Sequence, residues 1–198
     1  VTVSFAGQSD PSAADTAAGF RYSYDFDNDG VFEAGYTNVT LATVTVPGSL
    51  VLDDGFQTVR AVIRDKDGGT TELFTDIVIT NVAPTLHVAG AATAAEGSAY
   101  ALTLSATDPG QDAVLQWVVS WGDGTVETFN GPSQAVSHGF ADNGPRSISI
   151  TAVDEDGLYT ATKNVSVTNV APAVQNLVAL PADENGITRL SGTIVDPG

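Results

Sequence analysis

The chain has no cysteine and no methionine, and no run of apolar residues approaches membrane-spanning length. Without cysteine there is no disulfide framework, so each domain must be held together by core packing or by a metal ion. A helix needs about 20 consecutive apolar residues to cross a bilayer, and no stretch of this sequence supplies them. We therefore exclude a small disulfide-rich scaffold and direct membrane insertion.

Basic residues are also scarce. The 7 lysines and arginines stand against 24 aspartates and glutamates, which gives a formal net charge of −17 over 198 residues. Such a charge repels nucleic acids and anionic membrane surfaces, so we expect neither as a partner. It suits a well-hydrated surface, or a surface that gathers cations.

The sequence lacks the common motifs of catalysis. It contains no Gly-x-Ser-x-Gly, no phosphate-binding Walker loop, no His-Glu-x-x-His and no cysteine nucleophile. Pairs of carboxylates decide nothing in a chain with 24 acidic residues. The two histidines, His87 and His138, have no second histidine or cysteine nearby, so we do not expect zinc. We predict that the protein is not an enzyme and has no catalytic or cofactor-binding residues.

An internal repeat is the strongest pattern in the sequence. The segment Thr-Asn-Val-Ala-Pro at 80–84 recurs unchanged at 168–172, which is 88 residues later. The same offset carries Glu96 onto Glu184, and a closely similar offset carries the Asp-x-Asp-Gly turn at 65–68 onto 154–157. The repeat length is that of one immunoglobulin-like β-sandwich, so the repeat predicts tandem modules.

The repeat sets the expected domain boundaries. We predict a module at 1–84 that lacks its first strand, a complete module at 85–172, and the opening strands of a third module at 173–198. Proline at the end of each repeated segment restricts its own backbone and the preceding alanine, so we expect short, stiff linkers. Because the sequence starts at Val1 rather than methionine, we expect it to be a segment of a longer array.

Hydrophobic side chains alternate with polar ones, as in half-buried β-strands. The alternation is clear at residues 20–26, where Phe20, Tyr22, Tyr24 and Phe26 share one face, and at Trp117, Val119 and Trp121. We interpret the two tryptophans as core residues rather than a sugar-stacking platform. No stretch has convincing helical periodicity, so the sequence predicts an all-β fold.

Four segments resemble the polycystic-kidney-disease (PKD) domain family. Residues 119–124 (Val-Ser-Trp-Gly-Asp-Gly) are similar to the family's aromatic-Asp-Phe-Gly-Asp-Gly signature, and residues 24–30 repeat it with one residue inserted. Residues 136–140 and 153–157 resemble two later family segments. The resemblance implies immunoglobulin-like Greek-key β-sandwiches in a secreted or cell-surface protein.

An acidic hairpin after the first of these alternating segments is a candidate calcium site. The side chains of Asp25, Asp27, Asp29 and Glu33, with the backbone carbonyl of Val31, follow the spacing of the first part of an EF-hand loop. A predicted strand rather than a helix precedes them, so we expect a calcium-binding β-hairpin. The alternative is an acidic turn without metal, because Asp, Asn and Gly favour turns for local reasons.

The resemblance implies a second kind of calcium site. In some PKD modules of secreted proteases, calcium lies near the N-terminal linker, held by an early-loop aspartate and one from the Asp-x-Asp-Gly turn. The corresponding residues are Asp10 with Asp65, and Asp108 with Asp154, to which Asn81 in the linker adds an amide oxygen. The alternative is that these aspartates only start turns.

From these features we predict a non-catalytic structural or adhesive spacer in a long, calcium-stabilised extracellular array. Its expected partners are neighbouring modules of the same or adjacent chains, and a surface polysaccharide or protein. One alternative is an accessory polysaccharide- or protein-binding module of a secreted hydrolase. Another is a filament subunit assembled head to tail by strand donation, because 1–84 lacks a first strand that 173–198 contains.

Overall fold

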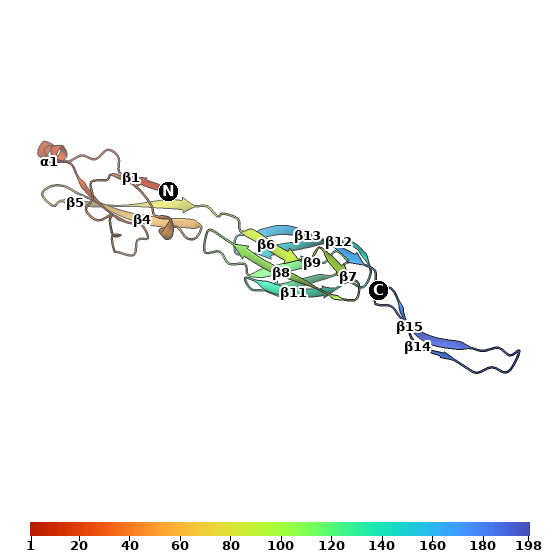
Figure 1. Cartoon of the computed structure of the whole chain (residues 1–198). Helices are drawn as coiled ribbons and strands as arrows, with labels where there is room; N and C mark the ends of the chain where they lie inside the picture. The colour runs from red at the N-terminus through yellow and green to blue at the C-terminus, as the bar shows by residue number, and fades with distance from the viewer. The chain divides into compact units, whose positions relative to one another are not determined.

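A computed structural model describes every residue of the chain, Val1–Gly198. The chain divides into two compact units (Figure 1). Unit 1 comprises Val1–Val82 with Pro109–Gln111, and unit 2 comprises Ala83–Asp108 with Asp112–Gly198. Both units are built almost wholly from β-strands, and none of the helices has the length and apolar character needed to cross a bilayer.

Unit 1 contains two antiparallel sheets. One sheet pairs β1 (Thr2–Ser4) with β3 (Thr43–Thr45). The other has the order β2-β4-β5, formed by β2 (Arg21–Asp25), β4 (Gly55–Arg64) and β5 (Thr70–Ile79). The remaining elements are α1 (Ala13–Ala18) and a 3-10 turn, η1 (Gly48–Leu50).

Unit 2 contains the larger sandwich. Its first sheet has the order β11-β8-β6, formed by β6 (Thr85–Gly90), β8 (Ala99–Thr107) and β11 (Gln134–Gly139). Its second sheet has the order β10-β9-β12-β13-β7, formed by β7 (Thr93–Ala95), β9 (Gln116–Ser120), β10 (Val126–Asn130), β12 (Gly144–Val153) and β13 (Leu158–Thr168). Only β7 and β13 pair in parallel. A separate antiparallel pair joins β14 (Ala173–Ala179) to β15 (Leu190–Val195).

The alternating segments form the cores, as predicted. Tyr24 and Phe26 are fully buried in unit 1, and Trp117, Val119 and Trp121 are fully buried in unit 2. The burial of both tryptophans leaves no exposed platform for stacking on a sugar. Each unit has its own hydrophobic cluster, so each unit is held together by its own core packing.

The helix α1 contradicts the expectation that no segment is helical. Ser12 caps it, because its side-chain oxygen accepts a hydrogen bond from the backbone N–H of Asp15 at 3.3 Å. The helix has only six residues. A segment this short cannot display a helical repeat of hydrophobic side chains, so only its cap and its alanines signal it.

The two units share part of one topology. The order β2-β4-β5 in unit 1 matches β9-β12-β13 in unit 2, and β1-β3 matches β8-β11. In unit 1, β1 pairs only with β3, and β5 pairs only with β4. The places that β6 and β7 occupy in unit 2 therefore have no counterpart among the strands of unit 1.

Candidate metal centre

The first candidate centre lies where β2 runs into the following loop. Asp25, Asp27 and Asp29 each place one carboxylate oxygen so that all three oxygens lie within 4.8 Å of one another. Asp25 is fully buried, whereas Asp27 and Asp29 are exposed. The structure therefore brings together the three aspartates that the sequence predicts as calcium ligands. They lie at the end of β2 and in the loop that follows it.

Backbone donors already engage the Asp25 carboxylate. It accepts hydrogen bonds from the N–H groups of Asp29 at 3.1 Å and Gly30 at 3.0 Å. Arg60 on the neighbouring strand β4 also lies 3.3 Å from the same carboxylate. Gly30 has φ of 95°, a conformation that glycine adopts without strain. These contacts shape the loop without a cation, as the acidic-turn alternative requires.

Glu33 and Val31 complete the predicted ligand set less directly. The Glu33 carboxylate accepts a hydrogen bond from the N–H of Phe26 at 2.7 Å, while its second oxygen, Oε2, is buried without a hydrogen-bond partner. Burial raises the pKa of Glu33, and the nearby charges of Asp27 and Asp25 add to the effect. The Val31 N–H donates to Asp29 at 2.8 Å. A hard cation would suit the three aspartates, because it prefers carboxylate oxygens, but Glu33 does not belong to their cluster.

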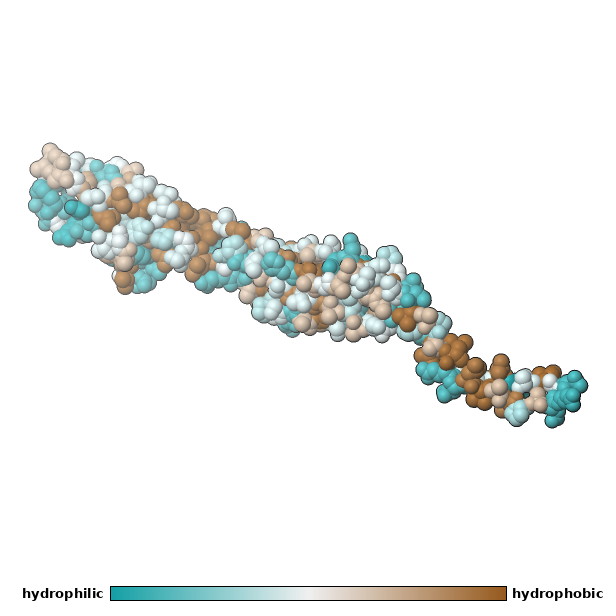
Figure 2. Space-filling view, viewed as in Figure 1, coloured by the Kyte–Doolittle hydropathy of each residue, from teal (hydrophilic) through white to brown (hydrophobic).

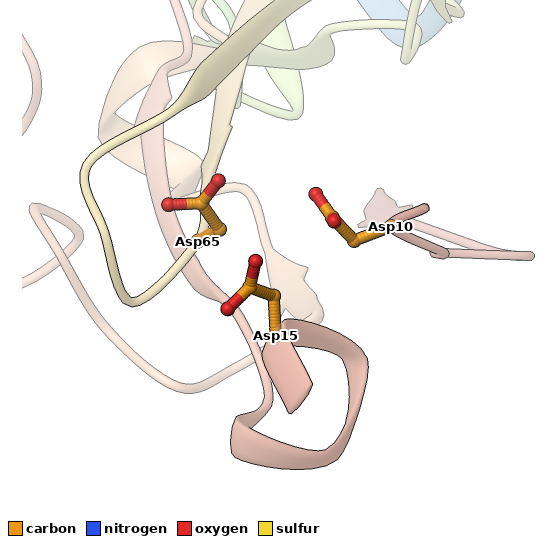
Figure 3. Close-up of side chains that lie close together, drawn as sticks. All are labelled: Asp10, Asp15 and Asp65. Atoms are coloured by element: carbon orange, nitrogen blue, oxygen red, sulfur yellow. The ribbon is translucent and has the colours of Figure 1, made fainter. Parts of the chain in front are cut away.

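A second cluster joins Asp10, Asp15 and Asp65 (Figure 3). Asp10 comes from the loop before α1, Asp15 from α1 and Asp65 from the end of β4. One carboxylate oxygen from each lies within 4.8 Å of the others. Asp10 and Asp65 also line a cavity of about 240 Å³. The pair expected from the family resemblance therefore lies together, with Asp15 as a third member.

Hydrogen bonds within the cluster account for part of its geometry. Asp65 accepts from the N–H groups of Asp67 at 2.9 Å and Gly69 at 2.8 Å, which closes the turn between β4 and β5. Asp10 accepts from the N–H of Ser12 at 2.7 Å. Both aspartates therefore also serve as turn residues, as the alternative interpretation of acidic turns without metal predicts.

Lys66 supplies a positive charge to the second cluster. Its ammonium lies 2.7 Å from Asp15 and 2.5 Å from Asp67, and these contacts raise the pKa of Lys66. The hydrogen bond from Lys66 lowers the pKa of the buried Asp15 carboxyl in return, although burial opposes it. Sequence reasoning missed both Asp15 and Lys66. Only the Ser12-x-x-Asp15 spacing, a helix-capping pattern, points to Asp15.

The third predicted set stays a prediction. Asp154 is buried and its carboxylate accepts from the N–H groups of Asp156 at 3.0 Å and Gly157 at 2.9 Å, which is a turn-forming role. Asp108 and Asp154 belong to no group of three or more metal-ligating side chains within 4.8 Å of one another. Asn81 belongs to unit 1, whereas those two aspartates belong to unit 2.

A contact in unit 2 joins two of the segments that carry the family resemblance. The His138 ring stacks on Trp121 with centroids 4.6 Å apart, and its Nε2 lies 2.6 Å from the Asp123 carboxylate. Burial alone would raise the pKa of Asp123, but hydrogen bonds from Thr125 and His138 outweigh it and lower that pKa to about 2. The contact holds β11 against the turn after β9.

Comparison with known proteins identifies the same region. Residues 81–169 match the PKD domain family. No curated protein matches the chain.

Three solved structures are similar to parts of the chain. A PKD domain of an M14-like peptidase from Thermoplasmatales archaeon SCGC AB-540-F20 is 24% identical, with a TM-score of 0.39, over 44% of this chain and 98% of that one. Fibronectin(III)-like modules of Clostridium thermocellum CbhA are 19% identical, with a TM-score of 0.38, over 74% and 77% of the two chains. The chicken interferon gamma receptor alpha chain is 9% identical, with a TM-score of 0.40, over 75% and 84%.

The family match, the sandwich of unit 2 and three of the four sequence segments, at 119–124, 136–140 and 153–157, fall in the same part of the chain. Residues 81–169 therefore match the PKD domain family, whose members are typically structural or binding modules.

Proposed function

We propose that the protein is a structural or adhesive spacer, built as an extracellular array of PKD-type modules and stabilised by calcium. One observation carries this proposal: the same Thr-Asn-Val-Ala-Pro segment stands before and after the PKD domain, and a strand follows each copy directly. β6 begins at Thr85 after the first copy, and β14 begins at Ala173 after the second. When similar modules follow one another through identical linkers, a protein can become longer by adding modules of the same fold.

The linker after the PKD domain is tied to the domain by a buried carboxylate. Glu96 is 2% exposed, and its Oε1 accepts a hydrogen bond from the N–H of Val170 at 2.7 Å. The Glu96 N–H donates to the carbonyl of Thr168 at 3.1 Å. These bonds hold the end of β13 and the start of the linker, which Pro172 then stiffens. A stiff linker of this kind suits a spacer that must hold its modules at a fixed separation.

The partners that fit this function are neighbouring modules of the same or adjacent chains. A net charge of −17 keeps the surface hydrated and favours a polysaccharide or protein ligand over nucleic acid. The two tryptophans do not contribute to a binding surface, because both are buried in the core of unit 2.

Calcium is the cation that the acidic clusters of unit 1 fit best. The loop at Asp25, Asp27 and Asp29 offers carboxylate oxygens on alternate residues, and these oxygens lie within 4.8 Å of one another. Calcium accepts six to eight oxygen ligands in flexible geometry, which an exposed loop can supply with water. In this loop a bound cation would compete with Arg60 for the Asp25 carboxylate.

The test is thermal unfolding in excess calcium and in excess chelator. Binding to the native state alone raises stability by about 2.7 kcal/mol at a hundredfold excess over Kd. Each kcal/mol moves the Tm of a domain this size by about 4–8 °C. We expect a rise of that order in the wild type, its loss in Asp27→Asn, and no change in Glu155→Gln, an exposed carboxylate in unit 2.

A parallel variant separates the two clusters. If the calcium-dependent rise survives Asp27→Asn but disappears in Asp10→Asn, the ion binds at the cluster of Asp10, Asp15 and Asp65 instead. If calcium does not raise the Tm of the wild type, the acidic clusters of unit 1 are turns without metal. The proposal that calcium stabilises the protein is then wrong.

A further inference from the structure

The sheet β2-β4-β5 of unit 1 has an outer face that is rich in aromatic and charged side chains. Val59 and Ala61 of β4 lie in the core, so the alternate residues of this strand point to the outer face. The register between β4 and β5 is continuous, so the outer residues of the two strands lie opposite one another. They include Phe56, Arg60 and Arg64 on β4, and Phe74, Asp76 and Val78 on β5.

The matching face of unit 2 has a different character. There β12 and β13 take the places of β4 and β5. Ile148 and Ile150 of β12 are buried in the core, so the residues between and beside them point outward. The outer residues in the middle of this face are Ser147, Ser149 and Thr151 on β12, and Thr160, Thr162 and Asn164 on β13. The shared topology therefore does not require rings and charges on this face, and their presence in unit 1 points to a function.

Two arginines stand side by side at one end of the outer face of unit 1. Arg21 of β2 is the cross-strand partner of Arg64, and both residues are exposed. Opposite residues of antiparallel strands have Cβ atoms about 4.5–5.5 Å apart, and like charges in such a pair destabilise the sheet. The pair therefore costs stability in the folded protein.

These two arginines have no carboxylate partner. The other two cations of unit 1 do, because Arg60 pairs with Asp25 and Glu72, and Lys66 pairs with Asp15 and Asp67. No ion pair of the structure includes Arg21 or Arg64, although the chain has 24 acidic residues. A guanidinium group binds a carboxylate or a similar oxyanion through two parallel hydrogen bonds. The pair is therefore suited to an anion supplied by a ligand.

Exposed rings continue along the same face. Phe74 lies opposite Arg60 and is 58% exposed, and Phe56 lies opposite Val78 and is 82% exposed. Figure 2 shows hydrophobic residues at the surface among hydrophilic ones. Four residues separate Arg64 from Arg60, and four more separate Arg60 from Phe56, which is about 13 Å for each step along the strand. The face therefore presents a cation pair and two rings in a row, as a long ligand requires.

Polar side chains between these features favour a sugar polymer. The Thr58 hydroxyl donates to Asp76 at 2.7 Å between the two rings, and Glu72 lies on the same face between Phe74 and the arginine pair. Carboxylates accept hydrogen bonds from hydroxyl groups at the edge of a sugar, while the C–H face of the sugar packs on a ring. The same carboxylates repel a nucleic acid, which carries a phosphate on every residue.

We propose that the outer face of β2-β4-β5 binds an acidic polysaccharide. An anionic group of the polymer binds to Arg21 and Arg64, and its sugar rings pack on Phe74 and Phe56. This inference rests on the proposed function, in which a surface polysaccharide is a partner, and it names the chemical class of the ligand and the face that binds it. The contacts need no calcium.

The test measures binding of the full chain to three soluble polymers in excess chelator, so that calcium cannot bridge carboxylates of the protein and the polymer. Polygalacturonate carries carboxylates, dextran sulfate carries sulfates, and dextran is uncharged. We expect binding to at least one charged polymer, weakened by added salt, and no binding to dextran. The charged polymer that binds identifies the anion that the arginine pair accepts.

Two kinds of variant test the residues, each with a matched control in unit 2. Arg21→Gln and Arg64→Gln should each weaken binding about tenfold or more, whereas Lys163→Gln removes the same charge elsewhere and should not. Phe74→Ala should also weaken binding about tenfold, whereas Leu158→Ala, at a residue that is 69% exposed, should not.

Thermal unfolding separates lost binding from lost folding. Arg21→Gln and Arg64→Gln each remove a like-charge repulsion, so their Tm should equal or exceed that of the wild type. A residue that only supported the fold would lower the Tm when it is replaced.

Three outcomes would overturn the inference. The first is that neither charged polymer binds. The second is binding that survives replacement of both arginines, which would assign it to another surface. The third is equally tight binding of a single-stranded DNA, which would show attraction to any polyanion. The calcium-dependent rise in Tm tests the spacer proposal separately, so either proposal can fail without the other.

Discussion

Four acidic residues are buried in this chain, and two of them, Asp15 and Asp25, lie beside a cation. Asp25 is fully buried beside Arg60, and Asp15 is 8% exposed beside Lys66. The sequence has only 7 lysines and arginines, and two of these, Arg60 and Lys66, form ion pairs with buried aspartates of unit 1. A carboxylate left in a core without such a partner is costly, so these contacts shape the acidic clusters.

Lys66 would compete with a metal ion for the carboxylate of Asp15, the one member of the second cluster that it contacts. In Lys66→Gln, Asp10, Asp15 and Asp65 keep their places without a neighbouring ammonium. We expect the variant to unfold at a lower temperature than the wild type in chelator, and to gain more from calcium than the wild type gains. Thermal unfolding in both conditions measures this, with Lys163→Gln in unit 2 as the control.

Asp123 gives unit 2 a stability that depends on pH. Its pKa in the folded protein is about 2, below the ordinary value of 3.8. The group therefore stabilises the fold fully above about pH 4, and this contribution is lost as the pH falls through about 2. We expect Asp123→Asn to destabilise unit 2 by about 1 kcal/mol at pH 7, since the carboxylate is hydrogen-bonded but partly solvated.

Urea unfolding from pH 7 to pH 2 measures the difference between Asp123→Asn and the wild type. The difference should hold down to about pH 4 and vanish near pH 2. A constant difference over the whole range would show that the substitution acts through packing against His138 and not through charge.

For individual residues, the sequence predicted which aspartates lie close together better than it predicted which residues form ion pairs. Asp25, Asp27 and Asp29 could be selected because their spacing is local, and the structure brings them together. Lys66 could not be matched to Asp15, because 51 residues separate them and only the fold makes them neighbours. Spacing along the chain carries no information about such a contact.

Strands were the predictable elements of the fold. Alternation identified β2 and β9 because one face of each strand is more deeply buried than the other. The helix α1 was missed because six residues are too few for a periodic pattern.

β12 is the element on which unit 2 depends most. It lies between β9 and β13, and its Ile148, Ile150 and Ala152 are fully buried. Ile150→Ala should destabilise unit 2 by about 3–4 kcal/mol, since it removes buried methylenes and leaves a cavity. Leu158→Ala is the matched control, because Leu158 is 69% exposed, and should change stability by less than about 0.5 kcal/mol. Denaturant unfolding compares the two variants.

The cap of α1 should also be measurable. Ser12→Ala removes the side-chain acceptor for the Asp15 N–H and should cost about 1 kcal/mol of stability in unit 1. Because Asp15 belongs to the second acidic cluster, any calcium bound there should also be held less tightly. Ser12→Asn, which retains a capping oxygen, should recover most of the loss.

The molecule as a whole has two independent hydrophobic cores. The core of unit 2 contains 14 buried hydrophobic residues, whereas that of unit 1 contains 9 and opens into a groove. Differential scanning calorimetry should therefore show two transitions, with unit 1 unfolding at the lower temperature. Calcium should move the lower transition and leave the upper one in place. A single cooperative transition would contradict this picture.

The parallel pairing of β7 with β13 has a mechanical consequence. Tension applied through Ala83 and Val170, at the two ends of the PKD domain, pulls β7 and β13 in opposite directions along their axes. The hydrogen bonds between Thr93–Ala95 and Ser166–Thr168 then bear load in shear, and they must break together rather than one after another.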